Sequence, residues 1–266
     1  MFEILSSAFM QKALFVGIIV SLISGLVSVF VVLRQMSFIG AGISHAAFGG
    51  VAIGFFTGIN PTITAIIYCI AVAIGIELVS RKGKVSEDVS IGIFFASSMA
   101  LGIVLVSLSK EYNVDLFGYL FGNILAITDR EVLLSLFVAV LVIGVIILFL
   151  KEIFITTYNE EIARVGGIPV RVINILFLIA LSVSIVISMK IVGIILISAL
   201  LVIPGATAQL FAKNLYLMIV ISWGVAVLST VLGLFFSYEF DIAPGGSIVL
   251  TATTLFLTAL LFKRRQ

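Results

Sequence analysis

Long apolar runs, separated by short polar or turn-forming segments, fill almost the whole chain. A helix needs about 20 mainly apolar residues to cross the hydrocarbon core of a bilayer, at about 1.5 Å per residue. Runs near that length fall at Ala13–Leu33, Phe38–Thr57, Pro61–Val79, Ser90–Leu108, Val132–Leu150, Val172–Ser188, Ile191–Leu210, Leu215–Ser237 and Ser247–Phe262. The pattern predicts an all-α, polytopic transmembrane helical bundle with about nine spans. Only Met189 and Lys190 separate two of the runs, so one long broken helix there, giving about eight spans, is the alternative.

Two segments between the runs are longer than turns. Residues 109–130 contain the apolar stretch Asp115–Leu125, which is too short to span and therefore predicts an interfacial or re-entrant helix on the outer side. Residues 151–171 form the only sizeable loop on the inner side, which the distribution of basic residues predicts to be cytoplasmic.

The inner loop carries the signals of a short helix. Asn159 is a good N-cap, and the acidic side chains of Glu160 and Glu161 suit a first helical turn. Gly166–Gly167 can close the helix and Pro169 stops it. We therefore expect a short helix lying on the inner face, where a partner protein can dock.

Composition supports the membrane assignment. Of the 266 residues, 62% are hydrophobic and 11% charged, and the mean hydropathy is +1.36. Soluble globular chains have about 25% charged residues, so lipid must be the solvent of this chain. We expect a single transmembrane domain, residues 1–266, in the plasma or inner membrane. The single cysteine, Cys69, excludes an internal disulfide framework.

The distribution of basic residues orients the bundle. With the N-terminus outside, 11 of the 15 Lys and Arg residues fall on the cytoplasmic side: Arg34, Arg81, Lys82, Lys84, Lys151, Arg164, Arg171, Lys213, Lys263, Arg264 and Arg265. The other four, Lys12, Lys110, Arg130 and Lys190, fall outside. This distribution follows the positive-inside rule and predicts a cytoplasmic C-terminus.

A search for catalytic motifs is negative. The sequence has no HExxH motif, no GxSxG motif and no Walker A loop, so we expect no enzyme activity and no ATP hydrolysis by this chain itself. Nothing in the sequence calls for a resident cofactor or a nucleic-acid partner.

His45 is the first candidate site residue. It lies in an apolar run rich in small residues, from Gly40 to Gly54, that lets helices approach closely or leaves a lumen beside them. Ionisable groups inside a span usually face the bundle interior or a cavity. One interpretation is a histidine that bonds to a neighbouring helix; the other is a transient transition-metal ligand in a transport pathway.

Two further segments could contribute to a pathway. Pro204 and Gly205 interrupt the run 192–209, which predicts a broken helix that packs on protein or lines a cavity; an ordinary proline kink is the alternative. At an outer mouth, Asp241 and Glu239 could attract cations, whereas a tight turn before the last helix explains the residues from Pro244 to Ser247.

Three segments taken together resemble the permeases of zinc-, manganese- and iron-type ABC importers: Ser44-His45-Ala46 with its following glycines, the segment Val192–Gln209, and Asp241–Ser247. The resemblance covers essentially the whole chain, from Gln11 to Phe262. It implies a permease that moves a divalent transition metal ion into the cytoplasm.

The resemblance also implies the partners. They are a second copy of the chain, two cytoplasmic ATP-binding subunits that use the ATP, and an extracytoplasmic metal-binding protein. In this family the inner loop carries a coupling helix, which corresponds here to Asn159–Gly167. Glu160, Glu161, Ala163 and Gly166 are then the positions expected to take part in coupling.

One position departs from the family pattern. Family members often have an aspartate four residues before the histidine, and here that residue is Ala41. Asp241, or His45 of a second copy, could compensate.

Two other functions remain alternatives: an ABC permease for a metal chelate such as cobalamin or haem, and a gradient-driven secondary metal transporter. The second would usually have carboxylates near the middle of its spans, and the runs above have none there.

Overall fold

The computed structural model describes residues 8–108 and 127–263, and these ranges form helices joined by short connections. The helices are α2 (Ala8–Leu33), α3 (Ile39–Thr57), α4 (Pro61–Gly83), α5 (Glu87–Leu108), α7 (Asp129–Leu148), α8 (Leu150–Tyr158), α9 (Glu160–Val165), α10 (Val170–Val192), α11 (Ile194–Leu200), α12 (Ile203–Gln209), α13 (Leu215–Phe240) and α14 (Pro244–Lys263). The all-α transmembrane fold is confirmed, since eight of the described helices are long and apolar enough to cross a membrane.

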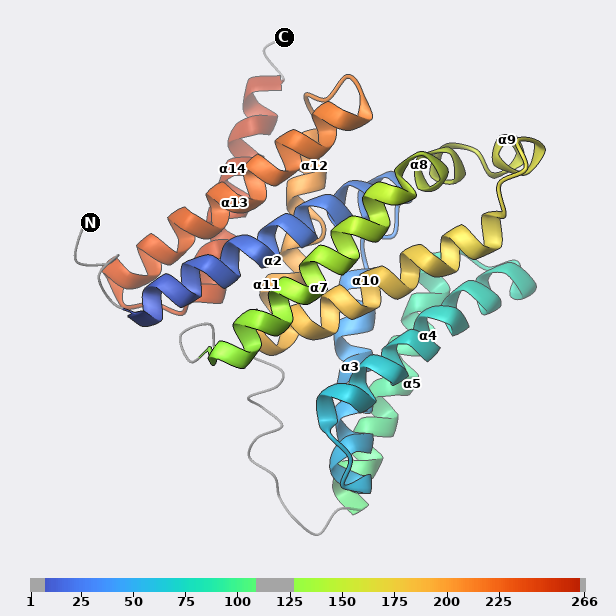
Figure 1. The fold of residues 1–266 in the computed structure, drawn as a ribbon, viewed down its shortest axis with the longest axis horizontal. Helices are drawn as coiled ribbons and strands as arrows, with labels where there is room; N and C mark the ends of the chain where they lie inside the picture. The colour runs from blue at the N-terminus through green and yellow to red at the C-terminus, as the bar shows by residue number, and fades with distance from the viewer. Residues whose placement is uncertain (1–7, 109–126, 264–266) are drawn as a thin grey trace.

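The ninth predicted run, Ile191–Leu210, is not one long helix. Helix α10 extends to Val192, and Gly193, at φ 85°, breaks the chain in a conformation that favours glycine. The short helices α11 and α12 follow, separated by a turn just before Pro204, which lies in the first turn of α12. In Figure 1 this pair runs back between the end of α10 and the start of α13. The described part of the chain therefore has eight long helices and one broken pair.

The structure describes only one of the two longer predicted segments in full. Residues 109–126 of the outer segment lie outside the described residues, and Asp129 and Arg130 already belong to α7, where Thr128 and Glu131 form a capping box. The inner segment is more helical than expected. After a short break at Phe149, residues 150–158 form α8, and the predicted surface helix follows as α9.

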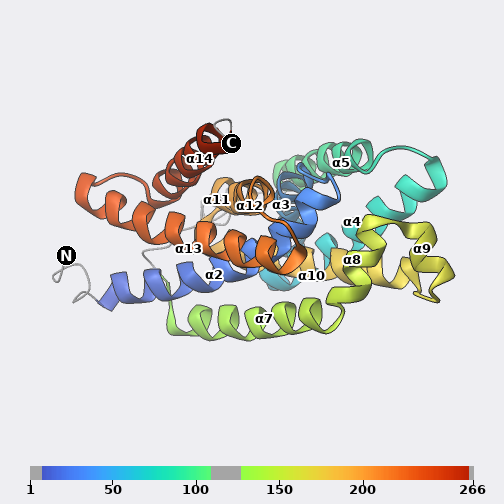
Figure 2. The same cartoon turned by 90° about the horizontal axis from the view of Figure 1, so that it is seen from above.

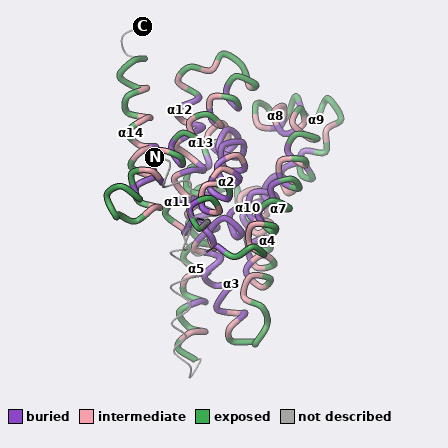
Figure 3. Tube along the Cα trace, turned by 60° about the vertical axis from the view of Figure 1, so that its left-hand side comes forward, coloured by how far each residue is buried: buried purple, intermediate pink, exposed green. Residues whose placement is uncertain are grey.

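Helices α2, α3 and α10 form the centre of the bundle, and α5, α7 and α14 lie at its edges with many exposed apolar side chains (Figure 3). Figure 2 shows α14, α13, α2 and α7 following one another across the bundle. Hydroxyl groups join α2 to α13: Ser21 Oγ lies 2.6 Å from Thr230 Oγ1, and Ser222 Oγ donates to the carbonyl of Gly25 at 2.6 Å. Such bonds hold helices together where the surrounding lipid provides no hydrophobic drive.

A second group of helices is built from α3, α4 and α5. Glycines on α3 allow close backbone approach, because a Cβ on Gly49 would lie 2.8 Å from the Ser98 carbonyl of α5, and a Cβ on Gly50 would lie 2.6 Å from Cα of Ala65 on α4. Helix α5 packs mainly on α3 and α4, whereas α10 and α11 connect this group to the rest of the bundle.

Polar contacts define the two ends of the bundle. At one end Lys12 pairs with Asp129 at 2.6 Å, and Lys190 pairs with Glu131 at 3.1 Å, which brings the starts of α2 and α7 to the end of α10. At the other end Arg34 Nε donates to Thr157 Oγ1 at 3.0 Å, next to α8 and α9. Since α13 runs antiparallel to α2 and to α14, the start of α2 and the end of α14 lie at opposite ends.

Candidate functional site

His45 lies on the buried helix α3, where it is partly exposed. Its Nδ1 is 2.9 Å from the carbonyl oxygen of Ala41, one turn earlier. Because a carbonyl oxygen only accepts, Nδ1 is the donor in this contact, and the tautomer with its proton on Nδ1 has its lone pair on Nε2. The Phe95 ring of α5 lies edge-on to the imidazole, with the ring centres 4.8 Å apart. The contacts of the described residues therefore leave Nε2 without a hydrogen bond and able to accept from, or ligate, a passing group.

No ready-made metal cage surrounds His45. Within residues 8–108 and 127–263, no three His, Cys, Asp or Glu side chains come together in a group that could hold a metal ion. Ala41 contributes its backbone oxygen to the histidine and has no side-chain ligand to offer. A lone imidazole is a weak, monodentate ligand, which suits brief contact with a moving ion better than storage.

Asp241 does not approach His45. It is the C-cap of α13, with φ 51° and ψ 45°, and it lies at the end of the bundle where α2 starts. Helix α13 packs on α2, α12 and α14, whereas α3 packs on α4, α5, α10 and α11. Its exposed carboxylate remains available to solvent at that end, and an entrance role remains a prediction.

Pro204 and Gly205 are buried against α2. The backbone N–H of Gly205 donates to Ser28 Oγ at 2.8 Å, and a Cβ on Gly205 would lie 2.5 Å from the Ser28 carbonyl oxygen. The first N–H groups of a helix have no partner within it, so Ser28 satisfies one of them from the neighbouring helix. The predicted break is present; whether these two residues line a pathway remains a prediction.

The predicted surface helix α9 is present with its predicted caps. Asn159 Oδ1 accepts from the backbone N–H groups of Glu161 at 2.8 Å and Ile162 at 3.0 Å. At the other end, the N–H of Ile168 bonds to the carbonyl of Ala163, and the N–H of Gly167 bonds to that of Arg164. This pair of bonds is a Schellman motif, and Gly167, at φ 77°, supplies its left-handed residue.

The four positions expected to take part in coupling differ in accessibility. Ala163 is fully buried and packs α9 onto the bundle, whereas Glu161 and Gly166 are exposed. The sequence reasoning missed three exposed apolar side chains on the same surface, Tyr158 at 81%, Ile162 at 58% and Val165 at 91%. Large apolar groups this exposed beyond the bundle's end indicate a protein contact surface.

Glu160 joins three elements and is not free for a partner. It accepts from Arg81 of α4 at 2.8 Å, from Arg164 of α9 at 3.2 Å and from Asn174 of α10 at 3.2 Å. Arg81 also pairs with Glu77 one turn earlier, as its sequence spacing suggests, and Glu77 is only 3% exposed. Glu160 thus fastens α9 to α4 and α10.

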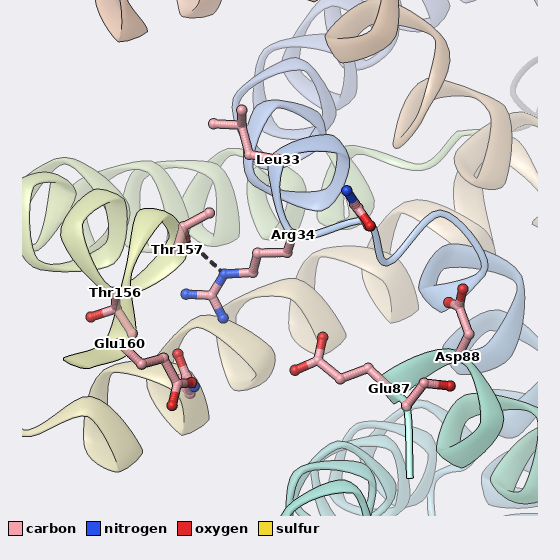
Figure 4. Close-up of a pocket in the computed structure, with 10 residues that line it drawn as sticks. Leu33, Arg34, Glu87, Asp88, Thr156, Thr157 and Glu160 are labelled. Atoms are coloured by element: carbon pink, nitrogen blue, oxygen red, sulfur yellow. Dashed lines mark hydrogen bonds between the residues drawn. The ribbon is translucent and has the colours of Figure 1, made fainter. Parts of the chain in front are cut away.

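A polar cavity of about 430 Å³ adjoins Glu160 (Figure 4). Its lining residues come from the end of α2, the start of α5, α8, α9 and α10: Leu33, Arg34, Gln35, Ser86, Glu87, Asp88, Thr156, Thr157, Glu160 and Asn174. The Arg34 guanidinium stacks on Phe177, with 4.5 Å from its central carbon to the ring centre. Burial lowers the pKa of Arg34 to about 10, while Glu87 opposes this shift, so Arg34 stays cationic at neutral pH.

Comparisons with known proteins agree with this architecture. Residues 6–263 match the model of the ABC 3 transport family. The manganese transport system membrane protein MntC of Listeria monocytogenes is 38% identical, over 97% of this chain and 92% of its own length. The high-affinity zinc uptake system membrane protein ZnuB of Haemophilus influenzae is 36% identical over the full length of both chains. A solved structure, PsaBC from Streptococcus pneumoniae in complex with Fab, superimposes with a TM-score of 0.85 at 39% identity, covering 97% of this chain and 93% of that one. The family match over residues 6–263 and the identity to these relatives show that the chain belongs to the ABC 3 transport family.

Proposed function

We propose that this chain is the permease subunit of an ATP-driven importer that carries a divalent first-row transition metal ion, manganese or zinc, into the cytoplasm. The observation that carries the proposal is α9, a capped surface helix whose exposed apolar side chains lie at the more basic end of the bundle. A cytoplasmic ATPase can dock on this surface and move the bundle. The names of the related manganese and zinc proteins support the choice of cargo. Iron, which the sequence resemblance also suggested, has no such support.

The assembly proposed is two copies of this chain, two ATP-binding subunits and an extracytoplasmic metal-binding protein. The end with Arg34, Arg81 and α9 is cytoplasmic, in accord with the positive-inside rule. The start of α2 is then outside and the end of α14 is cytoplasmic. A gradient-driven transporter would need a buried group that couples to protons or sodium ions. Among the described residues the buried carboxylate is Glu77, which forms an ion pair with Arg81 near the cytoplasmic end and is not available for that role.

The test is metal uptake by the complex reconstituted in vesicles, with manganese, zinc and iron offered singly and in competition. We expect accumulation of manganese or zinc, and lower uptake by His45→Ala with the complex still assembled. His45→Gln keeps a polar side chain but has no imidazole lone pair, so its metal uptake should also be lower. Undiminished uptake by both variants would make His45 structural, and accumulation of none of the metals would refute the proposal.

A further inference from the structure

Among the described residues, the polar contact between α9 and α4 is the ion pair of Arg81 with Glu160. The backbone of α9 packs on α8 and α10, and α4 is not among the helices packed closely against it. The connection to α4 runs through Arg81 Nη2, which lies 2.8 Å from Glu160 Oε1 on the first residue of α9. Arg81 also forms an ion pair with Glu77, which is buried and lies one turn earlier on α4. A displacement of α9 can therefore reach α4 directly through the side chain of Arg81, or indirectly through α10, which packs on both helices.

The cavity next to Glu160 lies between α9 and the start of α5, and α5 is not among the helices packed closely against α9. Figure 4 shows Glu160 and Thr157 on one side of this space and Glu87 and Asp88 of α5 on the other. The start of α5 is thus separated from α8 and α9 by about 430 Å³ of open volume. Arg34 Nη2, buried nearby, makes no hydrogen bond to any of the described residues and so forms no hydrogen bond across the gap.

Helix α4 is firmly attached to the helix that carries His45. Gly50 of α3 lies against Ala65 and Tyr68 of α4, with no room for a Cβ, and Cys69 Sγ lies 3.6 Å from the Ile43 carbonyl. Close-packed helices move as units because packed interfaces do not deform continuously. A shift of α4 along its axis would therefore move α3 and the imidazole with it.

We propose that the Arg81–Glu160 ion pair transmits the movement of α9 to the α3–α4–α5 group, with Arg81, anchored by Glu77, as a positioning residue for transport. The inference rests on the proposed function, because it assumes that an ATPase moves α9. Asn174 of α10 gives Glu160 a second attachment, to the central bundle.

The experiment measures ATP hydrolysed per metal ion accumulated in vesicles that contain the full complex. Arg81→Met should leave ATP hydrolysis near the wild-type rate and raise the ATP-to-metal ratio about tenfold, a usual size for coupling between two sites. The ATP-to-metal ratio of Arg81→Lys should lie between those of the wild type and Arg81→Met. The matched control is Arg164→Met, because Arg164 also binds Glu160, at 3.2 Å, but within α9. We expect this control to keep the wild-type ratio.

Further variants separate transmission from folding. Arg81→Met leaves Glu77 buried without its cation, so Glu77→Gln/Arg81→Met removes that cost and should remain uncoupled. Glu160→Gln is the second single variant, and Arg81→Met/Glu160→Gln should be no worse than the more severe of the two single variants, since both disrupt the Arg81–Glu160 contact. Independent, multiplying effects, or a wild-type ratio in Arg81→Met, would overturn the inference. Absence of uptake by the wild-type complex would instead refute the proposed function.

Discussion

The contact between Gly205 and Ser28 gives a quantitative prediction about the broken helix. In Gly205→Ala the new Cβ would lie 2.5 Å from the Ser28 carbonyl oxygen and 2.6 Å from its Oγ, where ordinary contacts are 3.4 Å or more. The nearest obstacle is backbone, which cannot rotate away, so α12 must move off α2. Overpacking of this kind costs about 1–3 kcal/mol.

Moving α12 also breaks a hydrogen bond. The N–H of Gly205 would lose Ser28 Oγ, now at 2.8 Å, and leaving a buried donor unpaired costs about 1–3 kcal/mol. Together the two effects predict a loss of about 2–6 kcal/mol in the free energy of unfolding. Ser28→Ala removes the bond without the clash and should cost only the hydrogen-bond part, about 1–3 kcal/mol.

The assay is unfolding in mixed micelles by SDS titration, followed by the fluorescence of Trp223. This is the only tryptophan of the chain, and its Nε1 donates to the Leu22 carbonyl at 2.8 Å, so it reports the α2–α13 contact beside α12. Gly144→Ala on α7 is the control, because a Cβ there meets nothing within 4 Å. If Gly205→Ala unfolds at the same SDS fraction as Gly144→Ala, the reasoning about close packing of α12 on α2 is wrong.

Three further sets of substitutions test local structure. Gly167→Ala should destabilise the end of α9 by about 1–2 kcal/mol, because Gly167 has a left-handed backbone conformation. Gly166→Ala should have little effect, because Gly166 has φ −74°. Hydrogen exchange of the α9 amides should therefore be faster in Gly167→Ala alone. Asn159→Ala should cost about 0.5–2 kcal/mol of α9 stability and Asn159→Asp much less, and equal exchange in the two would contradict capping by Asn159. Because Asp241 has φ 51°, Asp241→Gly should not lower the free energy of unfolding, whereas Asp241→Val should lower it by about 1–2 kcal/mol, as measured by SDS titration. Equal stability of Asp241→Val and the wild type would show that the turn can relax.

The features that the sequence predicted well depend on local chemistry. Apolar length gave the long helices, because each span satisfies its own backbone hydrogen bonds. The caps of α9 depend on Asn159 and the Gly166–Gly167 pair, all within a few residues of the helix. The ninth run was harder to predict because two breaks interrupt it, and the first depends on the backbone of Gly193, which its sequence context does not reveal.

The contacts that sequence reasoning missed join distant parts of the chain. Arg81 and Glu160 are 79 positions apart, and Ser28 and Gly205 are 177 apart. No periodicity or spacing connects such pairs, so their roles become visible only in the folded chain. Glu160 shows the consequence: the sequence placed it at a docking surface, and the structure adds that its carboxylate holds α9 to α4 and α10.

The measurement that tests the central claim most directly is the energy source of metal accumulation. The complex would be reconstituted with the metal and its binding protein outside the vesicles and ATP inside. We predict accumulation of manganese or zinc that requires hydrolysable ATP in the lumen and persists when a protonophore collapses the proton gradient. Accumulation that continues without ATP and stops with the protonophore would contradict the account and favour a gradient-driven transporter.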